Sequence, residues 1–493
     1  MKNTNFFFIF FFLSCLLIYF RLEIIFGSDI RAPFTDDFYY YLTTAKNFIN
    51  YGIISFDRIS LTNGFQPLWF FYILVIKFIT YDDVIFNSII IISIFLLSFF
   101  SYFNFKRYFL DEKYNEGECH LISSLICFLT LFFSKNGMEI ALAVYLFSLS
   151  LTYYKKNLLI FCAIGFLTFL SRLEFLIFYF IFLANDLFVN SKLFNTKYLI
   201  KVSFFPFLIL IYLIVNYFIF GYPLPESGIA KSLFKEIMFN KETFLFLNAE
   251  SFGMRFISIL FIFNSIGLLF LFTKNLKIFT KIILITTFLF FVSNSLRSPW
   301  PLWTWHFFFL SISTPILLND ILKIIKFRYL NIVTNFIGIF FVIAYSYLFL
   351  VNFNIKNDHI LNLAKKIENY YGNSQYEVFA MGDMAGKISY LLDKKLIQLE
   401  GLVGGNKVIN QIKKENDLCK LFKEYNVDIY FTSKIKKKIN DVYFVEEPSQ
   451  VSENIKKMRG QLNGEPIKIF KSADLYIYAF DLKKNKLCNT NLK

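Results

Sequence analysis

Charged side chains are scarce in this sequence. They make up 18% of the 493 residues, whereas soluble globular domains carry about 25%. Hydrophobic residues make up 56%, and the mean hydropathy is +0.52. This balance excludes an ordinary soluble protein and predicts an integral membrane protein.

Histidine and cysteine are also rare, and their spacing gives no metal-binding pattern. The three histidines, His120, His306 and His359, lie far apart in the chain. The six cysteines include no CxxC pair and no zinc-finger spacing. Only Cys419 and Cys488 lie in a polar segment, and they could pair if that segment lies outside the cytoplasm. Two cysteines alone leave the pairing open.

Three further signals are missing. The sequence shows no internal repeat of the kind found in inverted-repeat transporters. Its apolar N-terminal segment has no small-residue cleavage site, which favours an uncleaved first helix. The net charge of +15 does not predict nucleic-acid binding, because Lys and Arg occupy short loops between apolar runs instead of one basic face.

Long apolar runs dominate residues 1–350. A helix needs about 20 apolar residues to cross a bilayer, and somewhat fewer inside a packed bundle. The sequence predicts about eleven crossings on this basis. They lie at 5–26, 84–105, 119–134, 139–154, 158–172, 174–187, 198–220, 255–273, 278–294, 303–319 and 330–350.

Positive charges in the short loops predict the topology, because Lys and Arg favour the cytoplasmic side. One set of alternate loops carries most of these cations, and we expect it in the cytoplasm together with the N-terminus. The remaining loops, including 27–83 and 221–254, then face outward, and so does the segment 351–493. The same parity implies that the apolar stretch 67–80 does not cross.

The C-terminal segment has a different pattern. It contains two amphipathic helical stretches, near 357–371 and 407–425. Short alternating strands are expected near Glu377–Ala380, Lys395–Leu399, Asp428–Thr432 and Ile467–Phe480. The sequence therefore predicts an α-helical polytopic membrane domain, 1–350, followed by an extracytoplasmic α/β domain, 351–493.

The first outer loop, 27–83, contains the adjacent acids Asp36 and Asp37. Neighbouring carboxylates repel each other unless they share a proton or a cation, so at least one is expected to have a raised pKa. Such a group suits a general base that takes a proton from an attacking hydroxyl. Alternatively, both acids cap a helix that begins near Phe38.

Several motifs resemble bacterial members of the GT-C superfamily, which are polytopic membrane glycosyltransferases related to protein mannosyltransferases and aminoarabinose transferases. The matches span most of the chain. They are Asp36-Asp37-Phe38-Tyr39-Tyr40, the Gly52…Phe56-Asp57 turn, Thr62 to Trp69, Lys135 to Glu139, Gly221 to Ser227 with Lys231, Asp383 to Gly386, and Leu399 to Leu402.

The resemblance implies an inverting transferase that moves a sugar from a polyprenyl-phosphate donor to an extracytoplasmic glycan, lipid or protein. In such enzymes an acid in the first outer loop is the base, so Asp36 is the first choice and Asp37 the second. Glu139 occupies the second acidic position of the pattern, although an acid is also favoured at a helix start. A divalent metal held by these acids is compatible with oxygen ligands, but no cofactor is assigned.

An anionic lipid phosphate needs cationic partners. The outward candidates are Arg172, Lys231 and Arg297. Arg172 could instead be neutralised by Glu174, and the other two could be solvated loop charges. The substrate-contacting residues expected in the first outer loop are Tyr40, Asn63, Gln66 and Trp69, although the aromatic run that contains Tyr40 could also anchor the loop at the membrane interface.

A tryptophan-rich segment precedes the late helix at 303–319. Trp300, Trp303 and Trp305 could stack on a sugar or form an interfacial belt. Related sequences often show an aromatic residue beside the position of Trp305, where this chain has His306, and the role of His306 is left open.

Two other classes of function compete with a transferase. A transporter or flippase of lipid-linked glycans predicts ionisable residues deep inside the spans, whereas the main candidates here, such as Arg172, lie toward the outer ends. A membrane scaffold that works through its C-terminal domain is the other alternative.

Overall fold

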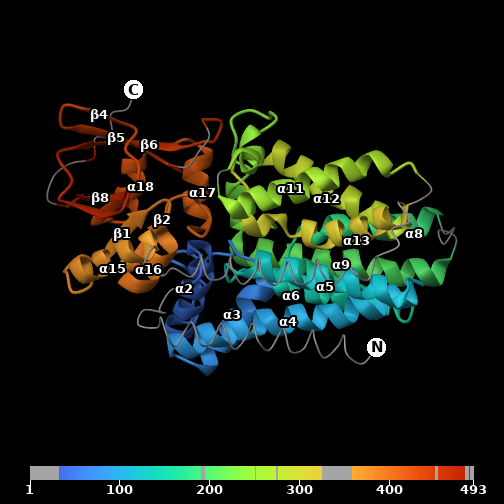
Figure 1. Cartoon of the computed structure of the whole chain (residues 1–493). Coiled ribbons are helices and arrows are strands. Elements are labelled where there is room, and N and C mark those ends of the chain that lie inside the picture. The colour runs from blue at the N-terminus through green and yellow to red at the C-terminus, as the bar shows by residue number, and fades with distance from the viewer. Residues whose placement is uncertain are drawn as a thin grey trace.

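The computed structural model describes residues 33–189, 195–249, 251–273, 276–324, 358–449, 453–483 and 488. The predicted spans 5–26 and 330–350 lie outside these residues. Figure 1 shows a bundle of helices that meets, at one end, a region containing β-strands. The chain is therefore a helical protein with a sheet-containing C-terminal region.

Among the described residues, six helical stretches are long and apolar enough to cross a membrane, which indicates a membrane protein. They are Asp83–Asp111 (α4), Glu116–Ser134 (α5), Thr196–Phe220 (α9), Gly253–Phe270 (in α11, Phe252–Gly267, and η3, Leu268–Phe270), Ile278–Arg297 (α12) and Thr304–Ile324 (η4, Thr304–Phe307, and α13, Phe309–Ile324).

Four apolar helices are shorter. They are Pro67–Ile79 (α3), Ile140–Tyr153 (α6), Leu158–Ser171 (α7) and Phe175–Val189 (α8). A helix of 14 residues, such as α6, is only about 21 Å long at 1.5 Å per residue. Length and composition therefore support six spans, and the expected count of about eleven stays a prediction.

Polar residues at the helix starts explain where several of these helices begin. The side chain of Asp82 accepts a hydrogen bond from the backbone N–H of Ile85 at the start of α4. Asn115, Asn157 and Asn195 do the same at the starts of α5, α7 and α9. A side-chain oxygen at this position satisfies an N–H that has no partner inside the helix.

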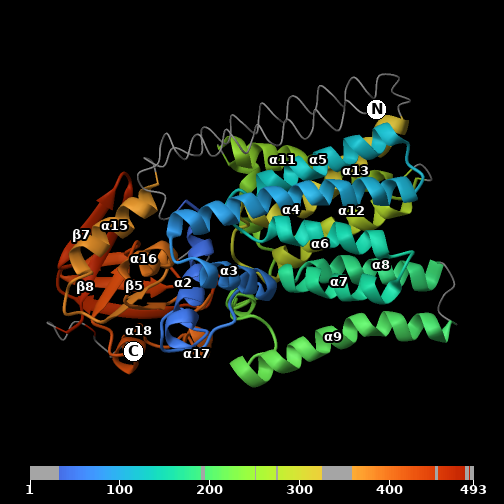
Figure 2. The ribbon, with the colours of Figure 1, turned by 90° about the horizontal axis from the view of Figure 1, so that it is seen from below.

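The bundle has a central and a peripheral part. In its most apolar stretch, α5 is 83% buried, whereas the corresponding stretch of α9 is only 17% buried. Figure 2 shows α9 along the edge of the bundle. The core is rich in phenylalanine; Phe147 packs edge-on against Phe178, with ring centroids 4.7 Å apart.

The loops that are predicted to face outward contain further helices, and α2 (Asp36–Tyr51) and a later short helix contact the C-terminal region. Helix α2 packs against both α3 and the C-terminal helix α16, and Figure 1 shows it between the two parts of the molecule. Helix α10 (Glu226–Ala230) and the 3-10 helix η2 (Lys241–Asn248) belong to a later loop.

The C-terminal region contains two sheets. The first has the order β2-β1-β3-β8-β7, in which β1, β2 and β3 are parallel and the β3–β8 and β7–β8 pairs are antiparallel. The second is the antiparallel sheet β4-β5-β6. The strands are Val378–Met381 (β1), Lys395–Gln398 (β2), Ile429–Thr432 (β3), Lys437–Ile439 (β4), Val442–Glu447 (β5), Met458–Asn463 (β6), Lys468–Ser472 (β7) and Leu475–Asp481 (β8), and the helices are His359–Tyr371 (α15), Ala385–Leu392 (α16), Gly405–Lys413 (α17) and Leu418–Glu424 (α18).

Two C-terminal predictions were wrong in detail. The helix expected at 407–425 is split into α17 and α18, because Glu415 has a left-handed backbone, with φ of 51°, and Asp417 starts a new helix by accepting from Cys419 N–H. The strand expected at Ile467–Phe480 is a hairpin that turns near Ala473, where φ is 50°. Strands β4 to β6 were not predicted.

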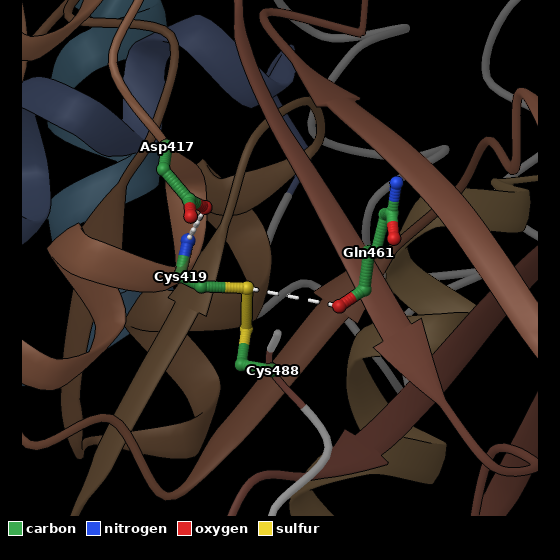
Figure 3. The surroundings of a disulfide bond; sticks show 4 residues. All are labelled: Asp417, Cys419, Gln461 and Cys488. Carbon is green, nitrogen blue, oxygen red and sulfur yellow. Dashed lines mark hydrogen bonds between the residues drawn. A yellow bond between two sulfur atoms is a disulfide. The ribbon is translucent and has the colours of Figure 1, made fainter. Parts of the chain in front are cut away.

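The cysteine pair that the sequence left open is a disulfide. Cys419, in α18, is bonded to Cys488 with an S–S distance of 2.01 Å, and Figure 3 shows the bond beside Asp417 and Gln461. Cys119, Cys127 and Cys162 are buried and form no disulfide among the described residues. Structural disulfides are typical of oxidising compartments, so the pair supports an extracytoplasmic location for this region.

Candidate functional site

Helix α2 presents Asp36 and Asp37 in its first turn. Among the described residues, the hydrogen-bond partners of the Asp36 carboxylate lie outside its own loop. Its two carboxylate oxygens accept from the backbone N–H groups of Gly386, at 3.0 Å, and Lys387, at 2.8 Å. These groups lie at the N-terminal end of α16, whose N-cap residue Met384 provides no side-chain hydrogen bond. Asp36 therefore caps a helix of the C-terminal region.

The approach of Asp36 to α16 is close. A Cβ atom at Gly386 would lie 2.2 Å from the backbone oxygen of Asp36, so glycine is needed at this position. Burial raises the pKa of Asp36 to about 7, against the opposing effect of the two N–H groups. The two backbone bonds occupy both oxygens of this carboxylate.

Asp37 has different surroundings. It is partly buried, and in the part of the chain that the structure describes no hydrogen bond to its carboxylate is found. Burial raises its pKa to about 6; Lys231 lowers that pKa, and Asp383 raises it. Asp37 is therefore mostly ionised at neutral pH, with lone pairs that no protein donor occupies among the described residues.

Lys231 follows the short helix α10, where it is the C-cap residue. Its side chain is partly buried. Within the described ranges no carboxylate lies within ion-pair distance of its ammonium group, although its charge acts on both Asp37 and His306. The predicted phosphate-binding lysine is thus near the predicted base.

Glu226 makes a second contact between the membrane part and the C-terminal region. It is fully buried, and its Oε2 accepts from Thr62 Oγ1 at 2.7 Å and from the backbone N–H of Gly405 at 3.1 Å. Gly405 is the first residue of α17. Burial raises the pKa of Glu226 to about 7. The carboxylate of Glu226 is therefore the acceptor for an N–H group at the start of another C-terminal helix, α17.

Asn63, expected to contact substrate, belongs to the same contact. Its Oδ1 accepts from the backbone N–H of Glu226 at 3.0 Å, and its Nδ2 donates to Asn216 Oδ1 at 3.3 Å. We name Asp36, Asn63 and Glu226, together with the N-terminal ends of α16 and α17, the docking interface.

Arg172 is the most buried cation of the predicted site, with 2% exposure. Its Nη1 donates to Glu139 Oε1 at 2.7 Å and to the backbone oxygen of Trp305 at 3.1 Å. Its Nη2 donates to Glu174 Oε1 at 3.3 Å. The pairing with Glu174 that the sequence offered as an alternative is confirmed, and Glu139 provides a second counter-charge.

Tyr41, which sequence reasoning did not select, joins this network to the first outer loop. Its hydroxyl donates to Glu139 Oε2 at 3.4 Å and accepts from the backbone N–H of Gln66 at 3.2 Å. Tyr41 was hidden inside an aromatic run. Arg297, the third predicted cation, is exposed at the end of α12; among the described residues no ion pair joins it to this network.

Of the other predicted loop residues, Tyr40 and Trp69 are buried and Gln66 is half-buried. Tyr40 is only 6% exposed and packs edge-on against Phe56, so it does not lie at the protein surface. Trp69 is fully buried and stacks on Tyr72. Among the residues that the structure describes, the indole N–H of Trp69 and the side-chain oxygen of Gln66 have no hydrogen-bond partner.

Two acids of the C-terminal region, Asp383 and Glu400, lie close to Asp37, and a third, Glu447, lies close to these two; none of the three was among the predicted site residues. Asp383 follows β1, Glu400 follows β2, and Glu447 ends β5. Burial raises the pKa of Glu400 well above its usual value, and Asp383, Glu447 and Asp37 raise it further. Burial raises the pKa of Glu447 to about 7. The carboxyl ends of parallel strands are a common place for ligands, which is a signal that could have identified Asp383 and Glu400.

The suggestion of a divalent metal has no geometric support. Among the described residues, no group of three or more His, Cys, Asp or Glu side chains could hold a metal ion. Two of the suggested ligands are engaged elsewhere, because Asp36 accepts from backbone N–H groups and Glu139 accepts from Arg172.

The structure thus brings together three of the predicted residues, Asp36, Asp37 and Lys231, at the junction between the bundle and the C-terminal region, and it places Glu139 and Arg172 in a neighbouring buried network. No protein-family model and no curated protein sequence matches this chain. The resemblance to GT-C transferases therefore rests on the motifs of the sequence, and the enzymatic activity stays a prediction.

Proposed function

We propose that this protein is an inverting membrane glycosyltransferase of the GT-C type that uses a polyprenyl-phosphate sugar as donor. The supporting observation is that Asp37 and Lys231 lie near each other at the junction without forming an ion pair. A carboxylate without a hydrogen-bond partner and a cation without an ion pair, among the described residues, act on each other at the junction. A carboxylate without a hydrogen-bond partner suits the role of proton acceptor. A cation without an ion pair near a bilayer suits binding of a lipid phosphate.

The reaction needs one base and one stabilised leaving group. Asp37 accepts the proton of an acceptor hydroxyl as its oxygen attacks the anomeric carbon of the donor sugar. The bond from that carbon to the phosphate oxygen breaks, and the electron pair leaves with the polyprenyl phosphate. Lys231 offsets the charge of this phosphate. A single displacement inverts the anomeric configuration.

Asp37, instead of Asp36, is the base in this proposal. Both oxygens of Asp36 already accept from Gly386 and Lys387 N–H groups. Turning this carboxylate toward a substrate would leave two N–H groups at the start of α16 without partners, and unpaired buried donors cost about 1–3 kcal/mol each. The order of preference that the sequence suggested is therefore reversed.

The buried network supports the donor side. Glu139 accepts hydrogen bonds from Arg172 and from the hydroxyl group of Tyr41. The same hydroxyl group accepts from the backbone N–H of Gln66 at the start of α3. The unpaired indole N–H of Trp69 and side-chain oxygen of Gln66 belong to the same end of α3 and suit hydroxyl groups of the donor sugar. Arg297 is exposed at the end of α12 and has no part in this proposal.

The acceptor approaches from the side of the C-terminal region. Asp383 and Glu400 provide oxygen atoms that suit hydroxyl groups of a glycan, lipid or protein acceptor. Because these acids act on Asp37, an acceptor with a negative charge near its reacting hydroxyl would be repelled.

The proposal includes the predicted topology of about eleven spans, with a cytoplasmic N-terminus and an extracytoplasmic C-terminal region in a bacterial inner membrane. The loop charges and the Cys419–Cys488 disulfide support this orientation. The partners are then the lipid-linked sugar, the acceptor and membrane lipids, and no nucleic acid.

Buried acids inside helices would support the transporter alternative if they lined a pathway, but Asp320 and Asp186 have other surroundings. Asp320, which is 2% exposed, accepts from Thr280 at 2.6 Å. Asp186, which is 1% exposed, accepts from Tyr198. Both acids lie near the C-terminal ends of their helices, α13 and α8, and each has a hydroxyl partner. These positions favour structural roles over a pathway through the bundle.

Mass spectrometry of cell-surface glycans and polyprenyl-phosphate sugars tests the proposal. We expect Asp37→Asn to remove one glycan and to cause its lipid-linked sugar to accumulate, while the protein remains inserted at the wild-type level. The control is Arg297→Gln, an exposed charge outside the junction, which should leave both pools unchanged. Unaltered pools in Asp37→Asn would contradict the proposed activity.

A further inference from the structure

His306 lies in the 3-10 helix η4 at the start of α13 and is 9% exposed. Its Nδ1 accepts a hydrogen bond from the backbone N–H of Trp303 at 3.0 Å. A ring nitrogen that accepts carries no proton, so the neutral imidazole has its proton on Nε2. The fold thereby assigns His306 one tautomer, with Nε2–H as its donor.

The turn that carries His306 is held from two sides. Arg172 donates to the backbone oxygen of Trp305 at 3.1 Å, and Asn136 donates to Thr304 Oγ1 at 2.7 Å. Together with the Trp303 bond, these contacts fix the backbone on both sides of His306. The direction of Nε2–H is therefore set before any ligand binds, which is the condition for preorganised recognition.

The charges that act on His306 are both positive. They belong to Lys231 and Arg172, and no acceptor in the described part of the chain takes the Nε2–H of His306. Arg172 is neutralised by Glu139 and Glu174, whereas Lys231 has no carboxylate within ion-pair distance among the described residues. The Nε2–H donor of His306 and the uncompensated charge of Lys231 together favour binding of an anion.

We propose that Nε2–H of His306 and the ammonium group of Lys231 together bind the phosphate group of the polyprenyl-phosphate donor. This inference rests on the proposed function and adds a ligand-binding residue to it. Lys231 also acts on Asp37, so the phosphate and the base share one cation. His306 donates a hydrogen bond and transfers no proton, because its other nitrogen is occupied by Trp303 N–H.

A purely structural role for His306 makes a different prediction, and two amide substitutions separate the two roles. The side-chain amide of Asn lies near the position of Nδ1 and can accept from Trp303 N–H. The side-chain amide of Gln reaches the position of Nε2 and can donate to a ligand. Phosphate binding by Nε2–H predicts that Gln preserves affinity, whereas a role limited to the turn predicts that Asn does.

The test measures binding of undecaprenyl phosphate to the purified full-length protein in lipid nanodiscs, with undecaprenol as the probe that lacks phosphate. We expect His306→Gln to bind undecaprenyl phosphate within about threefold of wild type, and His306→Asn and Lys231→Gln to bind it about tenfold more weakly, as for loss of a hydrogen bond to a charged group. Undecaprenol binding should be the same in all four proteins. Thermal unfolding of each variant shows whether the turn is intact.

The inference is overturned if His306→Asn binds undecaprenyl phosphate like wild type, or if His306→Gln loses affinity while its thermal unfolding matches wild type. It is also overturned if undecaprenol binding falls in parallel, because the phosphate would then not be what His306 recognises. Asp37→Asn separates this inference from the catalytic proposal, since it should bind the probe normally even though it does not transfer sugar. Failure of the wild-type protein to bind undecaprenyl phosphate would reject the donor class itself.

Discussion

In the docking interface each buried carboxylate has backbone N–H groups as partners. Asp36 accepts from the start of α16, and Glu226 accepts from the start of α17. The cluster of Asp37, Lys231 and His306 differs, because among the described residues no backbone N–H donates to the Asp37 carboxylate and no carboxylate pairs with Lys231, although Lys231 acts on both Asp37 and His306. The two regions are adjacent, and each contains one of the two neighbouring aspartates of α2.

The difference shows which carboxylates are structural. A group whose hydrogen bonds are all satisfied by the protein stabilises the fold and resists movement. A group with unused capacity and a shifted pKa is a candidate for binding or catalysis. Asp36 and Asp37 are neighbours in the chain, so the contrast between them depends on their surroundings and not on their residue type.

The largest expected effect on stability concerns Arg172, which forms an ion-pair network inside the bundle. Arg172→Met leaves the buried Glu139 and the half-buried Glu174 without a counter-charge, and breaking a buried pair such as Arg172–Glu139 costs about 3–5 kcal/mol. The free energy of unfolding measured in detergent checks this value. The exposed Arg297→Gln is the matched control, with a change within about 0.5 kcal/mol. If Arg172→Met unfolds like wild type but binds undecaprenyl phosphate weakly, Arg172 serves the ligand and not the fold.

A smaller effect is expected in the docking interface. Asp36→Ala removes the acceptor for two N–H groups and should destabilise the contact with α16 by about 1–3 kcal/mol. Hydrogen exchange should become faster at the amides of Gly386 and Lys387, while the amide of Gly405 keeps its protection. Glu226→Ala should produce the reverse pattern. Equal exchange in both variants would show that these carboxylates do not hold the two helix starts.

The smallest effect is a shift of a pH profile. Asp37 works as a base only when ionised, so the transfer rate should rise with pH through about 6, the pKa of Asp37, and then level off. Lys231 lowers that pKa. Lys231→Gln should therefore move the rising limb to higher pH, which transfer rates at saturating donor can measure. A limb that stays in place would show that Lys231 does not act on the base.

Much of the fold could be predicted from the sequence. Apolar length located the long helices. The asparagines at positions 115, 157 and 195 cap helix starts in the structure, and this local signal was not used to set the expected helix bounds. The split between α17 and α18 could not be predicted, because it depends on a left-handed residue, Glu415, in an otherwise helical pattern. The β7–β8 hairpin was read as one strand because Ala473 is not a typical turn residue.

The types of residue in the site could be predicted from the sequence, but the role of each residue could not. The sequence identified an acidic pair and outward cations. It could not show which of the two acids accepts hydrogen bonds from the protein, because the donors to Asp36 lie 350 and 351 positions away in the chain. Glu139 and Arg172 were assigned to different tasks, and only the fold shows that they form one ion pair. Contacts between distant segments leave no trace in local patterns.

The most direct measurement compares Asp36→Asn and Asp37→Asn in one assay of sugar transfer from the polyprenyl-phosphate donor, in membranes that contain equal amounts of each protein. The account predicts that Asp37→Asn lowers the transfer rate by at least about 100-fold, as for loss of a general base. Asp36→Asn, which keeps an oxygen that can accept from α16, should retain most of the rate. Full activity in Asp37→Asn together with loss in Asp36→Asn would contradict the account.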